Sequence, residues 1–171
     1  MRILARANAR ATFYVLGSQV AQREALLRRM LRQGNEIADH SWSHPTLPSY
    51  SQIHSTSVRI RRATGFRPCL FRPPAGPVNA RLVANARRAG MRTIAWDVDP
   101  KDWSTPGAGT IVRRVVNHVR PGSIVVMHDG GGSRAQTVAA LPSILRRLRH
   151  RGYRFVTTTE LLGGRPHWRP R

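Results

Sequence analysis

The chain has 171 residues, 40% of them hydrophobic, and its 29 arginines and lysines against 8 acidic residues give a formal net charge of +21. This length suits one domain with its own core. No apolar run reaches the roughly 18 residues of a membrane-spanning helix, and a single cysteine excludes an internal disulfide. We expect no transmembrane segment, and the arginine-bearing N-terminus shows no signal peptide in this chain.

The positive charge is almost entirely arginine, spread in pairs along the chain. Proteins that bind single-stranded nucleic acid usually combine a basic groove with interleaved aromatic residues, and no such strip is visible. The pairs therefore indicate solvated faces of successive helices, and we expect no specific nucleic-acid partner. Weak attraction to an anionic polymer or to a cell wall is more compatible with this charge.

Short apolar runs alternate with amphipathic segments along the chain. The spacing of Ile3, Leu4 and Ala7 predicts a helix at the N-terminus. Strands are then predicted at 11–16, 35–40, 69–72, 92–98, 123–128 and 153–158, and helices between them at 18–34, 50–64, 79–90, 109–122 and 138–152. This alternation predicts an α/β fold with a mostly parallel sheet, either open or closed into a barrel.

Four consecutive strands of this set end in polar residues that are capable of chemistry. In α/β barrels the carboxyl ends of the strands form the active-site face, so this regularity indicates a site. The residues concerned are Asp39 and His40, then Arg72, then Asp97, Asp99 and Asp102, and finally His128 and Asp129.

Each of these groups also has a plainer interpretation. His40 and His44, four residues apart, resemble half of a metal site, but two ordinary surface histidines would look the same. The loop Arg72-Pro-Pro-Ala75-Gly76 places an arginine and a backbone N–H in a rigid turn, which is also compatible with a purely structural role.

The remaining two groups follow the fourth and fifth strands. The stretch DVDPKDW holds three of the eight carboxylates, so Asp102 is a candidate partner for Arg72, and Trp103 is a candidate pocket wall. The alternative is an acidic loop that balances local arginines. His128 ends an apolar strand, where it is well placed as a general acid, although a core histidine is the alternative.

Taken in order, these motifs resemble those of the polysaccharide deacetylase family, also called carbohydrate esterase family 4, with its NodB-type domain. HSWSH, RPPAG, DPKDW and MHD are similar to four of the family's five ordered motifs, and TFYVLG to a strand that accompanies them. The resemblance covers residues 1–162, which we expect to form the domain, with 163–171 as a loose tail. It implies a distorted (β/α) barrel of the seven-stranded type.

The resemblance also implies a metal centre and its neighbours. His40 and His44 would bind a divalent metal, zinc or a similar ion. Arg72 would orient the catalytic base and would itself be held by Asp102. The backbone N–H of Ala75 would bind the oxyanion of the tetrahedral intermediate, although many relatives carry an aromatic residue at this position.

A second set of roles follows from the later motifs. Trp103 and Val126 would line the pocket for the acetyl methyl group. His128 would protonate the leaving amine, and Asp99 or Asp129 would set the charge state of that histidine.

The family's first motif, T-F-D-D-G, is missing from this chain. It supplies the third metal ligand and the catalytic base, yet the first acidic residue here is Glu24. We expect the first strand of the barrel to be missing as well. Two explanations stay open: the chain starts inside a longer enzyme, which we favour, or it is a non-catalytic remnant that binds carbohydrate or an anionic polymer.

The resemblance implies a metal-dependent hydrolase that removes N-acetyl groups from the amino sugars of a polysaccharide, either peptidoglycan or a chitin-like glycan. We expect this activity to be impaired in the present chain, because the base and the third ligand are missing. The family also suggests a monomer that works outside the cytoplasm, at the cell wall.

Overall fold

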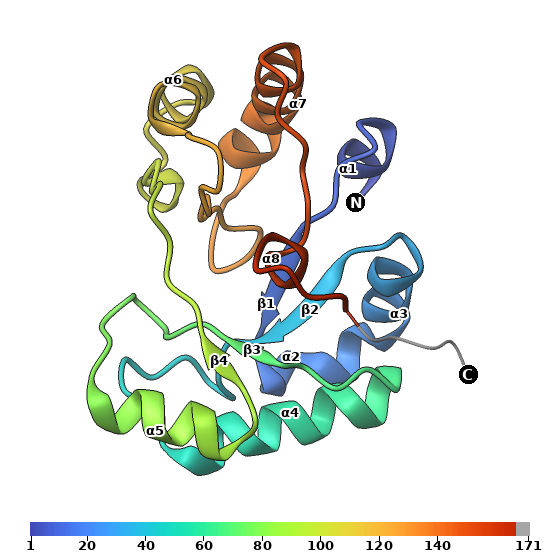
Figure 1. Ribbon diagram of the computed structural model, residues 1–171, viewed down its shortest axis with the longest axis vertical. Coiled ribbons are helices and arrows are strands. Elements are labelled where there is room, and N and C mark those ends of the chain that lie inside the picture. Colours follow the sequence, from blue (N-terminus) through green and yellow to red (C-terminus); the bar gives the residue numbers. More distant parts are fainter. Residues whose placement is uncertain (167–171) are drawn as a thin grey trace. The chain divides into compact units, whose positions relative to one another are not determined.

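The computed structural model describes residues 1–166, which fall into two compact units (Figure 1). The first unit comprises Met1–Ala9 and Trp96–Val156, and the second comprises Arg10–Ala95 and the described residues from Thr157 to Pro166. The loose tail expected at 163–171 lies partly outside the described residues. Within them, Gly163 and Gly164 donate backbone hydrogen bonds to carbonyls of the preceding helix. The single domain over 1–162 stays a prediction.

The second unit is built on a four-stranded parallel sheet. Its strands, in spatial order, are β1 (Thr12–Val15), β2 (Glu36–Asp39), β3 (Leu70–Phe71) and β4 (Arg92–Thr93). All four residues of β2 are buried, as expected for a central parallel strand covered on both faces. The parallel sheet expected from the sequence is confirmed, although β4 covers only the first two residues of the predicted 92–98.

Helices pack along this sheet as α2 (Gly17–Val20), the 3-10 turn η1 (Ala21–Arg23), α3 (Glu24–Arg32), α4 (Tyr50–Thr64), α5 (Ala80–Arg88) and α8 (Thr158–Leu161). The bounds of α4 agree with the prediction because Ser49 caps its start and Gly65 ends it in a left-handed conformation. Asn79 caps α5 in the same way, accepting from the N–H of Leu82. The single helix expected at 18–34 is instead α2, η1 and α3 in succession.

A buried carboxylate ties the last helix of the second unit to the sheet. Glu36 on β2 is fully buried and accepts hydrogen bonds from the hydroxyl of Thr12 at 2.9 Å and from the N–H of Thr159 at 3.1 Å. Thr157 and Glu160 form a capping box that starts α8. The strand predicted at 153–158 is wrong: residues 153–157 form no strand, and Thr157 caps the helix that begins at Thr158.

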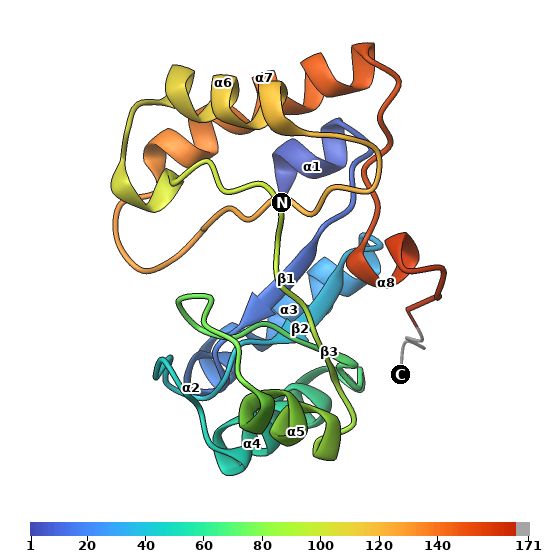
Figure 2. The ribbon, with the colours of Figure 1, turned by 60° about the vertical axis from the view of Figure 1, so that its left-hand side comes forward.

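The first unit packs α6 (Ala108–His118) against α7 (Ala135–His150), as Figure 2 shows. It also holds α1 (Arg2–Arg6) and the short 3-10 helix η2 (Asp102–Ser104). The core between the helices consists of residues that recur at helical spacing, among them Ile111, Val115, Ile144 and Leu148. The helix predicted at the N-terminus is confirmed by α1, and Pro142 lies inside α7.

The strand predicted at 123–128 is reduced to a single parallel bridge between Val125 and Val98. Next to the bridge, the carboxylate of Asp97 accepts hydrogen bonds from the hydroxyl of Ser123 and from the N–H of Ile124, both at 2.6 Å.

Candidate active site

The two histidines of HSWSH lie side by side just beyond the carboxyl end of β2. Their ring centroids are 4.9 Å apart, with the rings close to perpendicular. Nδ1 of His40 is 2.8 Å from the carbonyl oxygen of Arg72, which fixes the ring and makes Nε2 the nitrogen suited to bind a metal. The proximity expected from the HxxxH spacing is therefore present.

The loop that carries His44 is held by hydrogen bonds on both sides. The N–H of His44 donates to the hydroxyl of Ser41, and the N–H of Ser41 donates to the carboxyl group of Asp39. From the start of α2, the N–H of Gly17 donates to the carbonyl of Ser41, and the next N–H donates to the carbonyl of Trp42. These contacts give the motif TFYVLG a physical role, because its glycine, Gly17, supports the loop that carries His44.

Asp39 does not replace the missing third ligand. Its side chain is fully buried, and burial raises its pKa to about 8, which disfavours the charged form that binds a metal. Its Oδ1 accepts from Ser41, and Oδ2 has no hydrogen-bond partner. Residues 1–166 contain no cluster of three or more histidine, cysteine or acidic side chains placed to hold an ion. Hence His40 and His44 can supply two ligands to a divalent metal, but the described residues do not complete its coordination.

Arg72 is buried at the end of β3 and stacks on an aromatic ring. Its guanidinium carbon lies 3.9 Å from the centroid of the Tyr14 ring, and Nη2 donates to the carbonyl of Ala95 at 3.3 Å. Burial lowers the pKa of the guanidinium group. Ala75 is exposed in the turn after the two prolines, with φ at 56°. Their roles as orienting group and oxyanion donor stay predictions.

Asp102 and His128 form a hydrogen-bonded pair in the first unit. Oδ1 of Asp102 lies 2.8 Å from Nδ1 of His128, and Oδ2 accepts from the backbone N–H of His128 and from the hydroxyl of Thr137, each at 2.8 Å. Asp102 is 1% exposed, whereas the His128 side chain is 38% exposed. The aspartate is therefore fixed in the interior, and the imidazole it holds reaches solvent.

This pairing differs from the one expected for the aspartates. Asp99 or Asp129 was expected to set the charge of His128, but the carboxylate on its ring is that of Asp102. Asp99 instead accepts from the N–H of Lys101 at 2.7 Å, and Asp129 lies exposed after the histidine. The expected contact of Asp102 with Arg72 joins residues of the two units and stays a prediction.

The environment of Asp102 favours its charged form. Burial by itself raises the pKa of Asp102, but the hydrogen bonds from His128 and Thr137 outweigh it, so the pKa lies below its ordinary value. The carboxylate is thus ionised at neutral pH and stabilises a positive charge on the imidazole. Sequence reasoning missed Thr137, whose only signal is a polar residue on the apolar face of α7.

Trp103 and Val126 were expected to line one pocket for an acetyl methyl group. Trp103 lies in η2 with 53% of its surface exposed, while Val126 is buried and donates its N–H to the carbonyl of Val98. An exposed indole beside the fixed Asp102 suits contact with a sugar, but the shared pocket stays a prediction.

Backbone strain gathers in the motif loops. Residues other than glycine seldom adopt positive φ, and such strain is typical of functional sites. Among the described residues, six do so, and five of them belong to or adjoin the motifs: Ser41, His44, Ala75, Lys101 and Thr105, with Asn8 as the sixth. The folding of the chain therefore holds these loops in conformations that their sequences alone would not prefer.

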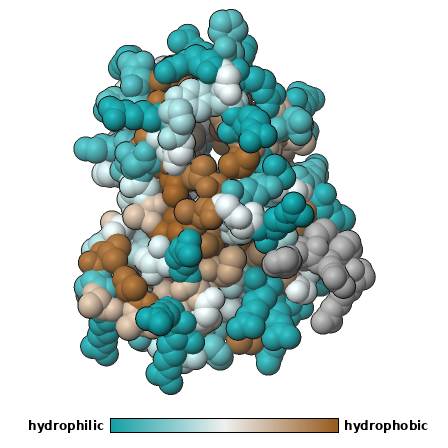
Figure 3. Space-filling model, viewed as in Figure 1, coloured by the Kyte–Doolittle hydropathy of each residue, from teal (hydrophilic) through white to brown (hydrophobic). Residues whose placement is uncertain are grey.

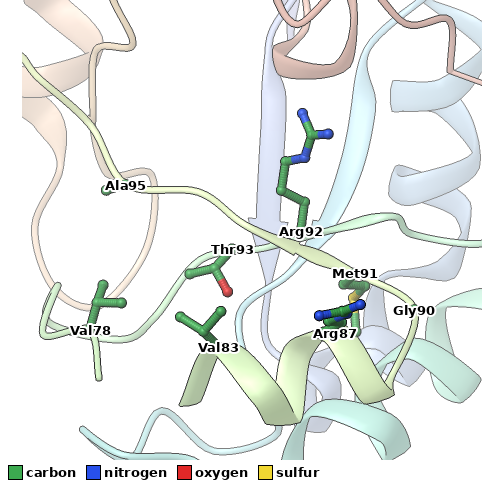
Figure 4. A pocket seen from close by; sticks show the side chains of 8 residues that line it. All are labelled: Val78, Val83, Arg87, Gly90, Met91, Arg92, Thr93 and Ala95. Atoms are coloured by element: carbon green, nitrogen blue, oxygen red, sulfur yellow. The ribbon is translucent and has the colours of Figure 1, made fainter. Parts of the chain in front are cut away.

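A separate pocket of about 590 Å³ lies beside α5 and β4 in the second unit (Figure 4). Hydrophobic residues show at the lower left of Figure 3. Of the pocket lining, Val78 and Val83 are about half exposed. The pocket is lined by Val78, Val83, Arg87, Gly90, Met91, Arg92, Thr93 and Ala95. It contains none of the side chains that the motifs select, so it does not define the candidate site.

Comparison with known proteins gives consistent matches. A family described as polysaccharide deacetylase matches residues 1–94. A peptidoglycan-N-acetylglucosamine deacetylase of Bacillus cereus is 40% identical over 168 residues, covering 94% of this chain and 78% of its own length. The chain spans only 32 to 34% of the length of several longer curated relatives at 39 to 40% identity.

Solved structures match over most of the chain as well. The peptidoglycan deacetylase PdaC from Bacillus subtilis superposes with a TM-score of 0.86 at 38% identity, covering 95% of this chain and 80% of that one. A pseudoenzyme of carbohydrate esterase family 4 from Bacillus anthracis gives 0.87 at 30% identity, covering 94% and 58%. The α/β fold of the distorted-barrel type, expected from the motifs, is confirmed by these likenesses.

Proposed function

Because the chain belongs to the polysaccharide deacetylase family, we propose that it is a hydrolase that removes N-acetyl groups from the amino sugars of a cell-wall glycan. The relatives that resemble it are deacetylases of peptidoglycan and of chitooligosaccharides. This substrate class supports a place of action at the cell wall, outside the cytoplasm. The observation that carries the proposal is the hydrogen-bonded pair of Asp102 and His128.

The pair suits the step in which the amide bond breaks. Cleavage of an N-acetyl group leaves an amine nitrogen, which must gain a proton to depart. Asp102, buried and ionised, accepts the hydrogen bond from Nδ1 of His128 and stabilises the imidazolium form. Nε2 of His128 then carries the proton to the leaving nitrogen. Thr137 contacts the same carboxylate at 2.8 Å and positions it.

Metal dependence is the finer part of the proposal. Two neutral imidazoles, His40 and His44, are ligands that zinc and similar divalent ions accept. The contact between His40 and the carbonyl of Arg72 orients one of them. The described residues do not complete the coordination, so weak metal binding and slow turnover are the expected behaviour of this chain.

The proposal is tested by measuring acetate released from N-acetylglucosamine oligomers with zinc present. We expect slow release above the uncatalysed background. His128→Asn should lower it about 100-fold, because general acid catalysis typically contributes at least that much. His118→Asn is the matched control, since this exposed histidine in the same unit contacts only a neighbouring carbonyl in its own helix. Equal release by the two variants would remove His128 from the mechanism.

A second candidate function is binding of the glycan without catalysis. It is favoured by the incomplete set of metal ligands and by the likeness to a family pseudoenzyme. It predicts that glycan oligomers bind the chain equally well before and after treatment with a chelator, while no acetate is released. Acetate release that disappears with His128→Asn would exclude this candidate.

A further inference from the structure

The C-terminal end of α7 carries an unusual concentration of positive charge. Residues 146–154, hereafter the α7 basic segment, read RRLRHRGYR and contain five arginines, one histidine and no acidic residue. The acidic residues of the first unit are Asp97, Asp99, Asp102 and Asp129, all of which lie in the motif region of the sequence. Nothing acidic within the segment itself balances the arginines.

Packing directs these arginines outward. Ile144, Leu145 and Leu148 are buried on the inner side of α7. The five arginines of the segment are all exposed. Gly152, with φ at 84°, turns the chain after the helix, and Arg154 follows two residues later. The negative end of the helix dipole favours cations in this last turn. The surface over α6 and α7, at the top of Figure 3, is mostly hydrophilic.

Two of the guanidinium groups are positioned by neutral acceptors. Nη2 of Arg149 donates to the carbonyl of Asn8 at 3.3 Å, and Nη1 of Arg151 donates to the carbonyl of Val116. A carbonyl accepts a hydrogen bond without cancelling the positive charge. The segment is therefore partly ordered and remains fully charged, which is what a binding surface for an anionic ligand requires.

The aromatic residues of this region are not free to stack on nucleic-acid bases. Tyr153 and Phe155 pack against the core of the first unit, and the hydroxyl of Tyr153 donates to the carbonyl of Val119. Arg151 and Arg149 lie over the two rings, at 5.7 and 5.8 Å from the centroids. None of the large apolar side chains that are exposed among the described residues lies within 146–154, and Val138 is the one that belongs to α7, so insertion of the segment into a lipid surface is also disfavoured.

We propose that the α7 basic segment binds a phosphate-bearing polymer of the cell wall and so holds the protein on its substrate. This proposal rests on the proposed function, because a cell-wall substrate is what brings the protein to a surface that carries such a polymer. Thr137 near the start of α7 contacts Asp102, and Arg149 follows twelve residues later, about 18 Å along the helix axis at 1.5 Å per residue. A polymer bound there leaves the His128 region accessible to the glycan.

The test is cosedimentation of the full chain with cell walls, before and after extraction of their phosphate polymers. We expect the protein to bind the unextracted walls at least about 10-fold more tightly. A variant with Arg146→Gln, Arg147→Gln, Arg149→Gln and Arg151→Gln should lose this difference. Long-chain polyphosphate serves as a soluble probe. The slope of the logarithm of its binding constant against the logarithm of the salt concentration should become shallower by about 3 in this variant, because each lost phosphate contact contributes about 0.7.

Two matched variants separate a local surface from overall charge. Changing Arg29, Arg32, Arg61 and Arg62 to glutamine removes the same charge from exposed positions of α3 and α4, and should weaken wall binding by less than about 3-fold. Lysine at the four α7 positions retains the charge and should retain binding, which controls for folding. Equal loss in both glutamine variants, or preference for single-stranded DNA over polyphosphate, would overturn the proposal.

Acetate release from soluble oligomers keeps the two proposals apart. The α7 glutamine variant is expected to release acetate at the wild-type rate, since none of its changes lies in the His128 region. Loss of wall binding with release intact confirms the surface independently. If the wild type bound cell walls but released no acetate, the binding role of the α7 basic segment would stand and only the proposed function would be contradicted.

Discussion

Replacing Asp102 by alanine is expected to destabilise the protein by about 3 kcal/mol, because it strands buried hydrogen-bond donors. The backbone N–H of His128 and the hydroxyl of Thr137 both lose their acceptor, and the imidazole loses the group that fixes it. Urea unfolding at pH 7 measures the loss. Asp99→Ala is the control, since its exposed carboxylate accepts one hydrogen bond from Lys101 and its removal should cost under about 1 kcal/mol.

The effect of Asp102 should also depend on pH. The pKa of its carboxyl group in the folded protein lies below the ordinary value of 3.8. Its stabilising contribution is therefore complete above the unfolded pKa and is lost as the pH falls through the folded pKa. The difference in unfolding free energy between the wild type and Asp102→Asn should shrink below about pH 4. A difference that stays constant down to pH 2 would contradict the assigned hydrogen bonds.

Gly17→Ala is expected to destabilise the protein by about 1 to 3 kcal/mol through overpacking. A Cβ atom at this position would lie 2.5 Å from the hydroxyl of Thr56 and 2.5 Å from the ring of Trp42. The main chain at Gly17 also supports the loop of His44, so the alanine should displace that loop. Thermal unfolding measures the stability, and the NMR signals of His40 and His44 report the displacement.

Gly109→Ala provides a control of opposite sign. Gly109 lies inside α6 with open space around the position of a Cβ atom. Alanine there should stabilise the helix by about 0.4 to 1 kcal/mol, because it restricts the unfolded chain more than glycine does. If both alanine variants stabilised the protein, the close approach of Gly17 to Trp42 would be refuted.

The helices were largely predictable because their ends are encoded locally. Ser49 and Gly65 define α4, and Asn79 starts α5, each through contacts with residues near in sequence. Strands were harder to place, since a strand exists only where a neighbour pairs with it. The segments at 92–98 and 123–128 have the apolar character of strands, but their pairing is limited to a few residues.

The candidate site was found from its motifs, but its pairings were not. His40 and His44 are close in sequence, so their proximity followed from spacing. The contact of Asp102 with His128 spans 26 residues, and that with Thr137 spans 35. Nothing local distinguishes Asp102 from Asp99 or Asp129 as the partner of the imidazole. That choice depends on the packing of η2 against the start of α7, which only the folded chain specifies.

The incomplete metal site of His40 and His44 is tested most directly by the affinity of the full chain for zinc, measured by calorimetry at neutral pH. We predict a dissociation constant weaker than about 1 µM, because two imidazoles without a third protein ligand leave the coordination incomplete. This binding should vanish in His40→Ala and persist in His54→Ala, a variant of an exposed histidine in the same unit. Nanomolar binding that His40→Ala abolishes would refute the two-ligand site, since it would require a third ligand that the described residues do not supply.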